Sequence, residues 1–173
     1  EIITQYIKEQ SEIYDIGGGI GVYAAWLAKA GHQVHLIELA DGAVAFAKKE
    51  MMQENTFIAE VGDARKINRP DESADVVLLL GPLYHLQNES DRALALKEAY
   101  RVLRKDGLLI AAGISKYSST TWALSVYGTQ NNLIDETDFF GMLHEELTTG
   151  KHNRPKAYPY LIAEAYFTTP KSM

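Results

Sequence analysis

Residues 13–21 read I-Y-D-I-G-G-G-I-G, the segment that most directly indicates the fold. An apolar run of strand length ends in a glycine-dense turn, and residues 22–30 then carry a helical pattern closed by Gly31. Glycine is required where the backbone adopts positive φ or approaches a ligand without a Cβ in the way. The stretch therefore predicts a strand, a turn and a helix whose first N–H groups face whatever lies over the turn.

A single acid ends the next apolar run. Glu38 closes residues 34–38, which read as a second strand about 20 residues beyond the glycine turn. A carboxylate at the tip of that strand is placed to accept hydrogen bonds from ribose hydroxyls. The glycine turn and Glu38 together predict that an adenosine-containing cofactor binds here.

The first two-thirds of the chain alternates between strand and helix. We expect helices over residues 1–8, 43–52 (with Asp41 as N-cap) and 91–103, and further strands over 56–61, 74–80 and, after a turn at 105–107, 108–114. This alternation is typical of βαβ units with right-handed crossovers. The predicted fold class is α/β, with a doubly wound, mainly parallel sheet.

The character of the chain changes after Ser115. We expect helices over residues 118–127 and 135–147, the second with Thr137 as a candidate cap, and a strand over 160–167. Aromatic residues are frequent from Tyr117 to Phe167. We interpret residues 1–173 as a single domain, in which 1–115 form a cofactor-binding core and 116–173 a helical, aromatic insertion or lid.

Composition narrows the function classes. The 173 residues are 46% hydrophobic and 23% charged, which is ordinary for a globular protein, and no apolar run reaches membrane-spanning length. There is no cysteine, and the five histidines are scattered, so we predict no disulfide, cysteine nucleophile or metal site. The net charge of −6 disfavours a nucleic-acid partner. We expect a cytoplasmic protein with no membrane partner and no N-terminal signal peptide.

Four features follow four expected strands. The glycine turn follows the first, Glu38 ends the second, Asp63 follows the third, and Gly81-Pro82 follows the fourth. The carboxyl ends of parallel strands meet at one edge of a sheet, where open α/β folds bind ligands. Four signals at one edge therefore predict a ligand site more strongly than a glycine-rich turn alone.

In these segments the chain resembles the class I S-adenosylmethionine-dependent methyltransferases, of the broad group that acts on small molecules. The matching segments are I-Y-D-I-G-G-G-I-G, L-I-E-L, V-G-D-A, D-V-V-L-L-L-G-P-L-Y-H-L and E-A-Y-R-V-L-R-K-D-G-L-L-I, all within residues 13–114. The resemblance implies a Rossmann-like fold, S-adenosylmethionine as the cofactor, and methyl transfer to a small-molecule acceptor.

The resemblance also implies roles for residues around the glycine turn. Gly17, Gly19 and Gly21 would form the turn beneath the methionine part of the cofactor. Asp15 would orient that turn and the amino group, usually through water. Gly81 would offer its carbonyl to the methionine ammonium.

The remaining cofactor contacts implied by the resemblance lie after the second and third strands. Glu38 would hold the ribose hydroxyls, with Leu39 packed on the adenine. Asp63 would accept from the adenine amino group, and the backbone N–H of Ala64 would donate to the ring. Two alternatives stay open, because Glu38 also fits a solvated strand end and Gly-Asp also makes an ordinary turn.

Methyl transfer from a sulfonium is an in-line displacement, so alignment and exclusion of water are the main tasks of the protein. A base is needed only if the acceptor must lose a proton. Tyr84 and His85 are the candidate catalytic residues, since they follow the fourth strand and histidine ordinarily titrates near neutral pH. The alternative is that His85 caps a helix or contacts cofactor and that Tyr84 only lines the pocket. The aromatic tail equally fits a lid over an apolar acceptor or an ordinary core.

Two departures from the family shape the expected partners. The fourth motif is G-P-L-Y rather than the N-P-P-Y of many enzymes that methylate adenine, cytosine or glutamine amides, which favours a small-molecule acceptor. Family members also continue past the fifth strand with a helix and two more strands. We therefore expect the C-terminal strands to be missing here, and the fifth strand to be an edge that a homo-oligomer or a further C-terminal segment covers.

Two other functions stay open. An NAD(P)-dependent oxidoreductase fits Gly19-x-Gly21-x-x-Ala24 and Glu38, but it leaves Asp15 and G-P-L-Y-H-L without a role. A non-catalytic S-adenosylmethionine-binding protein of methyltransferase-like fold is the third reading.

Overall fold

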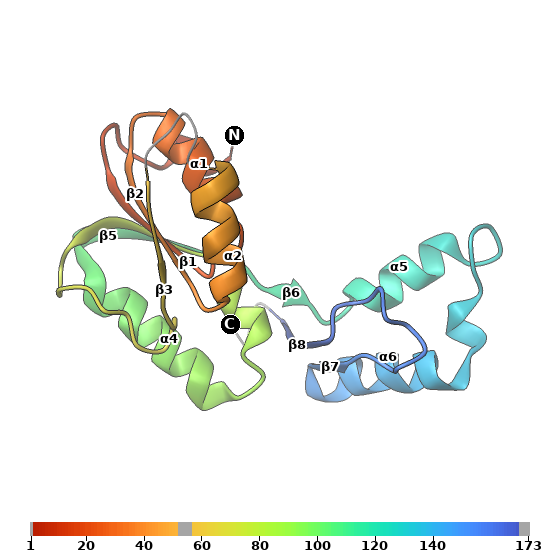
Figure 1. Ribbon diagram of the computed structural model, residues 1–173. Helices are drawn as coiled ribbons and strands as arrows, with labels where there is room; N and C mark the ends of the chain where they lie inside the picture. The colour runs from red at the N-terminus through yellow and green to blue at the C-terminus, as the bar shows by residue number, and fades with distance from the viewer. Residues whose placement is uncertain (1, 52–56, 170–173) are drawn as a thin grey trace. The chain divides into compact units, whose positions relative to one another are not determined.

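The structure is a computed structural model that describes residues 2–51 and 57–169 (Figure 1). The chain divides into two compact units, each considered by itself below. The first consists of Glu1–Leu83 and Asn88–Ala112, and the second of Tyr84–Gln87 and Gly113–Met173. The short segment Tyr84–Gln87 packs with the later part of the chain.

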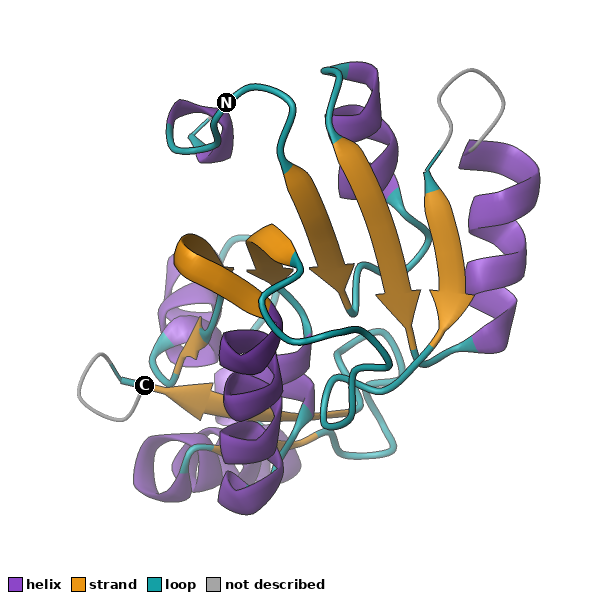
Figure 2. Ribbon diagram, turned by 90° about the vertical axis from the view of Figure 1, so that its left-hand side faces the viewer, coloured by secondary structure: helices purple, strands orange, loops and turns teal. Residues whose placement is uncertain are grey.

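A five-stranded parallel sheet forms the first unit. Its strands are β1 (Glu12–Ile16), β2 (Gln33–Glu38), β3 (Ile58–Val61), β4 (Ala74–Leu79) and β5 (Leu103–Ala111). Their order is β3-β2-β1-β4-β5, and neighbouring strands point the same way (Figure 2). Strand order reverses between β1 and β4, so the crevice outside their carboxyl ends is the expected ligand site. The predicted doubly wound α/β fold with a parallel sheet is confirmed.

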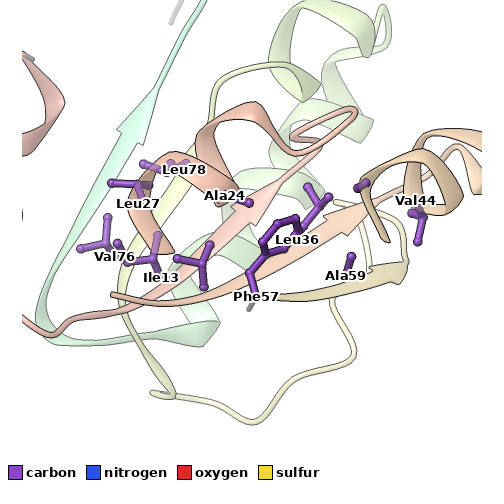
Figure 3. Packing of buried hydrophobic residues seen from close by; sticks show 11 residues of the cluster. Ile13, Ala24, Leu27, Leu36, Val44, Phe57, Ala59, Val76 and Leu78 are labelled. Atoms are coloured by element: carbon purple, nitrogen blue, oxygen red, sulfur yellow. The ribbon is translucent and has the colours of Figure 1, made fainter. Parts of the chain in front are cut away.

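Helices cover both faces of this sheet. They are η1 (Ile3–Gln5), α1 (Val22–Lys29), α2 (Asp41–Phe46) with its π-helical continuation η2 (Ala47–Met51), α3 (Pro82–His85) and α4 (Glu89–Val102). Side chains alternate across β1, so Ile13 joins the core under α1 and α2 (Figure 3). Tyr14 and Ile16 join the core under α4. By the same alternation, Asp15 lies on the face that α1 and α2 cover.

The second unit has a small sheet and a core of its own. Its elements are β6 (Ile114–Ser115), α5 (Ser118–Val126), η3 (Leu133–Asp135), α6 (Thr137–Thr149), β7 (Lys151–Asn153) and β8 (Glu164–Thr168). The strand order is β6-β8-β7, in which β8 pairs in parallel with β6 and antiparallel with β7. Phe139, Met142 and Tyr158 are buried in its hydrophobic cluster, so part of the aromatic tail is core.

A buried contact between a carboxyl group and an imidazole ring holds α6 to β7 in the second unit. The Glu146 carboxyl and the His152 imidazole are fully buried, and Glu146 Oε1 lies 2.5 Å from His152 Nδ1. The other ring nitrogen lies 2.8 Å from the carbonyl oxygen of Ile162, and Ser119 Oγ donates to Glu146 Oε1 at 3.0 Å. Both nitrogens of His152 lie within hydrogen-bonding distance of acceptors, so the ring joins α6 to β7 and to the carbonyl of Ile162.

Several expected boundaries are wrong. The fifth strand was expected over 108–114, but β5 begins at Leu103 and ends at Ala111, and Ile114 pairs in β6 instead. The turn expected at 105–107 is an irregularity inside β5, with Asp106 at φ 63°. Residues 2–8 contain the three-residue 3-10 helix η1 rather than the expected longer helix. Asp41 and Thr137 begin their helices instead of capping them.

The later expected elements also shift. The last strand was expected over 160–167, but β8 is Glu164–Thr168, and β7 was not predicted. Met52, the expected end of the second helix, and Thr56, the expected start of the third strand, lie outside the described residues. Within the part of the chain that the structure describes, β5 is the last strand of its sheet.

Candidate functional site

The glycine turn after β1 adopts left-handed backbone at alternate positions. Gly17, Gly19 and Gly21 have φ of 66°, 59° and 84°, a conformation that other residues adopt only at a cost. The N–H of Gly17 donates to the carbonyl of Ile37 at 2.7 Å, which ties the turn to β2. A Cβ at Gly19 would meet no heavy atom within 4 Å, so the turn is open above that residue.

The turn also contacts the residue that follows Gly81 after β4. A Cβ at Gly17 would lie 2.6 Å from Pro82 Cγ. The loops after β1 and β4 therefore touch at the position where strand order reverses. Gly81 and Pro82 are both buried. Sequence reasoning singled out Gly81 but gave Pro82 no role, although the G-P dipeptide marked the position.

Gly18 lies directly over the side chain of Asp15. A Cβ at Gly18 would lie 2.3 Å from Asp15 Oδ2. Gly18 was not predicted to be needed, because the expected turn used only the glycines at alternate positions. The uninterrupted run of three glycines was the signal that all of them are needed.

Asp15 is a buried carboxyl group with unused hydrogen-bonding capacity. Only 1% of the residue is exposed, and Oδ2 has no hydrogen-bond partner among the described residues. Burial raises the pKa of the Asp15 carboxyl to about 7, opposed by a hydrogen bond from the Ala24 backbone and reinforced by the charge of Glu38. The site therefore contains an acceptor oxygen that the chain itself does not satisfy.

Glu38 links the glycine turn to the end of β2. Its Oε2 accepts the N–H of Gly19 at 2.9 Å, and its Oε1 accepts the N–H of Ala40 at 2.9 Å. A carboxylate oxygen can accept more than one hydrogen bond, so both oxygens retain capacity for a ligand hydroxyl. The adjacent Leu39 is 64% exposed, which leaves an apolar side chain available to pack against a ligand ring.

Asp63 is held by an arginine that sequence reasoning did not single out. The N–H and Nε of Arg65 donate to Asp63 Oδ1 at 2.8 and 3.0 Å, and Nη2 donates to Oδ2 at 2.7 Å. The hydrogen bonds from Arg65 lower the pKa of the Asp63 carboxyl. Arg65 Nη1 also pairs with the carboxylate of Asp91, which lies in the first turn of α4. Ala64, between Asp63 and Arg65, is half-buried.

Tyr84 and His85 belong to the second unit, whereas the residues described above belong to the first. Their ring centroids are 4.7 Å apart with planes tilted by 52°, and His85 is exposed whereas Tyr84 is partly buried. Across the described residues, no cluster of three or more acidic, histidine or cysteine side chains is suited to a metal ion. In the same residues no helix is both long and apolar enough to span a bilayer.

Comparisons with known proteins identify related chains. The family described as "Methyltransferase domain" matches residues 14–111. The ubiquinone/menaquinone biosynthesis C-methyltransferase UbiE of Neisseria meningitidis is 28% identical over 119 residues, which cover 66% of this chain and 47% of the relative. The ribosomal protein L11 methyltransferase of Desulfitobacterium hafniense is 28% identical over 130 residues, covering 69% of this chain and 37% of the relative.

A solved structure extends the similarity to the whole chain. The S-adenosylmethionine-dependent methyltransferase from Methanosarcina mazei superposes with a TM-score of 0.74 at 24% identity, covering 99% of this chain and 79% of that one. At this identity the similarity concerns the fold. This chain spans about half the length, or less, of the two curated relatives, since 47% and 37% of their residues are matched. Those relatives are equally identical to this chain, yet one is named for ubiquinone/menaquinone biosynthesis and the other for ribosomal protein L11.

Proposed function

The chain belongs to the methyltransferase domain family, whose cofactor is S-adenosylmethionine, and we propose that it transfers a methyl group from that cofactor to a small-molecule acceptor. The observation that carries the proposal is the glycine turn between two acids. The orphaned Oδ2 of Asp15 lies beneath the turn, and Glu38 binds its edge through Gly19. A turn of this kind suits a ligand that brings a cation and hydroxyl groups.

The charges at the turn favour this cofactor over a dinucleotide. A dinucleotide fold sets the pyrophosphate over the glycine turn, where it meets backbone N–H groups. Here the buried carboxyl of Asp15 lies beneath the turn, and a pyrophosphate beside it would oppose its ionisation, whereas Glu38 fits the ribose of either cofactor. A methionine ammonium is instead attracted by a carboxylate at Asp15. The open space above Gly19 leaves room for it.

Each remaining cofactor contact follows from the chemistry of one residue. We assign Glu38 to the ribose hydroxyls, Leu39 to the adenine face, Asp63 and the Ala64 N–H to the adenine edge, and the Gly81 carbonyl to the ammonium. Asp63 is suited to an amino group because Arg65 keeps its carboxylate ionised and therefore able only to accept. When bound, S-adenosylmethionine supplies an activated methyl group on sulfur.

The second unit supplies candidate acceptor contacts. We assign Tyr84 and His85 to the acceptor, where His85 takes a proton if the acceptor must lose one. Exposed aromatic side chains of this unit, namely Tyr117, Trp122, Tyr127, Phe140 and Tyr160, offer an apolar surface for a lid. The net charge of −6 favours a neutral or cationic small molecule over nucleic acid. With no cysteine in the chain, a cytoplasmic setting is our working assumption.

Thermal unfolding with added ligand separates the candidate functions. We expect S-adenosylhomocysteine to raise the melting temperature and NADH at equal concentration to leave it unchanged. Protection by NADH alone would favour an oxidoreductase and contradict the proposal. Transfer of labelled methyl from S-adenosylmethionine to fractions of a metabolite extract then tests catalysis. Binding without transfer to any fraction would favour the non-catalytic reading.

A further inference from the structure

The buried carboxyl of Asp15 has a use beyond shaping the glycine turn. Its Oδ2 has no partner among the described residues, only 1% of the residue is exposed, and Gly18 covers it closely. An ionised carboxylate in such a place loses its hydration, and the hydrogen bond from the Ala24 backbone replaces only part of it. The cofactor-free protein is therefore better suited to the neutral acid than to the anion.

Among the residues that the structure describes, the surroundings of Asp15 supply no cation to balance an anion. In the sheet its register partners are Leu36 of β2 and Leu78 of β4, both fully buried. From α1 the backbone of Ala24 makes a hydrogen bond to it, and the charged group that acts on it is the carboxylate of Glu38. An acid next to another acid holds its proton more tightly.

A cation on the ligand would shift Asp15 from its protonated to its ionised form. The proposed function brings an ammonium group to the glycine turn, and a cation near a carboxyl favours its ionised form. On the strength of that proposed function, we propose that Asp15 holds a proton in the cofactor-free protein and releases it to solvent when the cofactor's ammonium binds. The O–H bond of the acid breaks, its electron pair stays on the carboxylate, and the ammonium keeps its own protons.

Proton release makes affinity depend on pH. Because the pKa of Asp15 is raised to about 7, the empty site is mostly protonated at pH 6 and mostly ionised at pH 8. Ligand binding below that range must displace the proton, which weakens apparent affinity. We expect the dissociation constant for S-adenosylhomocysteine to fall roughly 20-fold between pH 5.5 and 7.5.

Calorimetric titration tests the release directly. The whole chain is titrated at pH 6 with S-adenosylhomocysteine in two buffers of different ionisation enthalpy. The difference between the two observed binding enthalpies gives the number of protons released per ligand. We expect nearly one proton per ligand. With 5′-methylthioadenosine, which has the same nucleoside but no ammonium, we expect binding without proton release. Equal release with both ligands, or none with either, would overturn the inference.

Two variants assign the proton to its residue. Asp15→Asn is expected to abolish proton release. Glu60→Gln is expected to leave it unchanged, because the Glu60 carboxylate lies on β3 and pairs with Arg69. If Asp15→Asn does not fold, the comparison of the two ligands on the wild-type chain still decides. Binding of S-adenosylhomocysteine without proton release contradicts this inference but not the proposed function. Failure of both nucleosides to bind contradicts both.

Discussion

The α-carbon of Gly18 packs directly on the carboxyl group of Asp15, where a Cβ would lie 2.3 Å from Oδ2 and 2.5 Å from Cγ. The contact joins the buried end of β1 to the turn that follows it. Gly18 is therefore required for space, whereas Gly17, Gly19 and Gly21 are required for their left-handed backbone.

Gly18→Ala is expected to destabilise the protein by about 2 kcal/mol, because the added methyl has no room beside a buried side chain. Urea denaturation measures the change. Gly42→Ala is the matched control, since Gly42 lies in α2 with open space around its Cα and alanine favours a helix. The control is expected to be neutral or slightly stabilising. Equal stability of the two variants would contradict the packing described for Asp15.

Asp15→Asn is expected to change how stability depends on pH. The folded pKa of Asp15 is raised to about 7 from 3.8, so its favourable contribution is complete below about pH 4 and is lost as pH rises to 7. The amide does not titrate. The ligand-free variant should therefore gain roughly 4 kcal/mol relative to wild type between pH 4 and pH 8.

Denaturant unfolding of both proteins at the two pH values measures this gain. The titration of all other groups is common to both chains, so only the difference between variant and wild type is compared. A difference that is the same at pH 4 and pH 8 would show that Asp15 ionises normally.

Asp63→Asn is expected to reduce discrimination between amino and oxo groups on the purine. The wild-type carboxylate, held by Arg65, accepts from an adenine amino group and repels the oxygen of hypoxanthine. An amide can donate or accept, so the preference should fall about tenfold or more. The measurement compares dissociation constants of S-adenosylhomocysteine and its inosine analogue. An unchanged ratio would remove Asp63 from the purine contact.

Glu146→Ala is expected to destabilise the second unit by about 3 kcal/mol or more. The change leaves the buried His152 ring and the Ser119 hydroxyl without their acceptor. Glu145→Ala, on the same helix, is the control and removes only an exposed hydrogen bond with Asn153. Hydrogen exchange at the amides of β7 and β8 reports the loss locally. Equal protection in both variants would show that the buried pair contributes little.

The parallel core was predictable because local signals and tertiary structure agree there. β1 and β4 are short segments buried on both faces, and a glycine follows β1 directly and β4 after one residue, so the position of each strand could be read directly. The positions after the strands then followed from topology. Two side-chain contacts were not predicted, because the sequence does not show which side chains meet in space. They are the packing of Gly18 on Asp15 and the hydrogen bonds from Arg65 to Asp63.

The second unit was less predictable because distant partners determine its strands. β7 reads K-H-N without an apolar pattern, and His152 is buried there only because Glu146 of α6 receives it. The expected last strand began too early because the guanidinium of Arg154 binds the carbonyls of Pro159 and Leu161, which holds that segment in a turn. Neither interaction has a local signal in the sequence.

The most direct test of the account is calorimetric titration with S-adenosylhomocysteine of the wild-type chain and of Glu38→Ala. Glu38 accepts the N–H of Gly19 and is assigned to the ribose, so its loss removes two contributions to one site. We predict micromolar binding by the wild-type chain and at least a 30-fold weaker dissociation constant for the variant, about 2 kcal/mol. Equal binding by both chains, or none by the wild type, would contradict the assignment of the cofactor to the glycine turn.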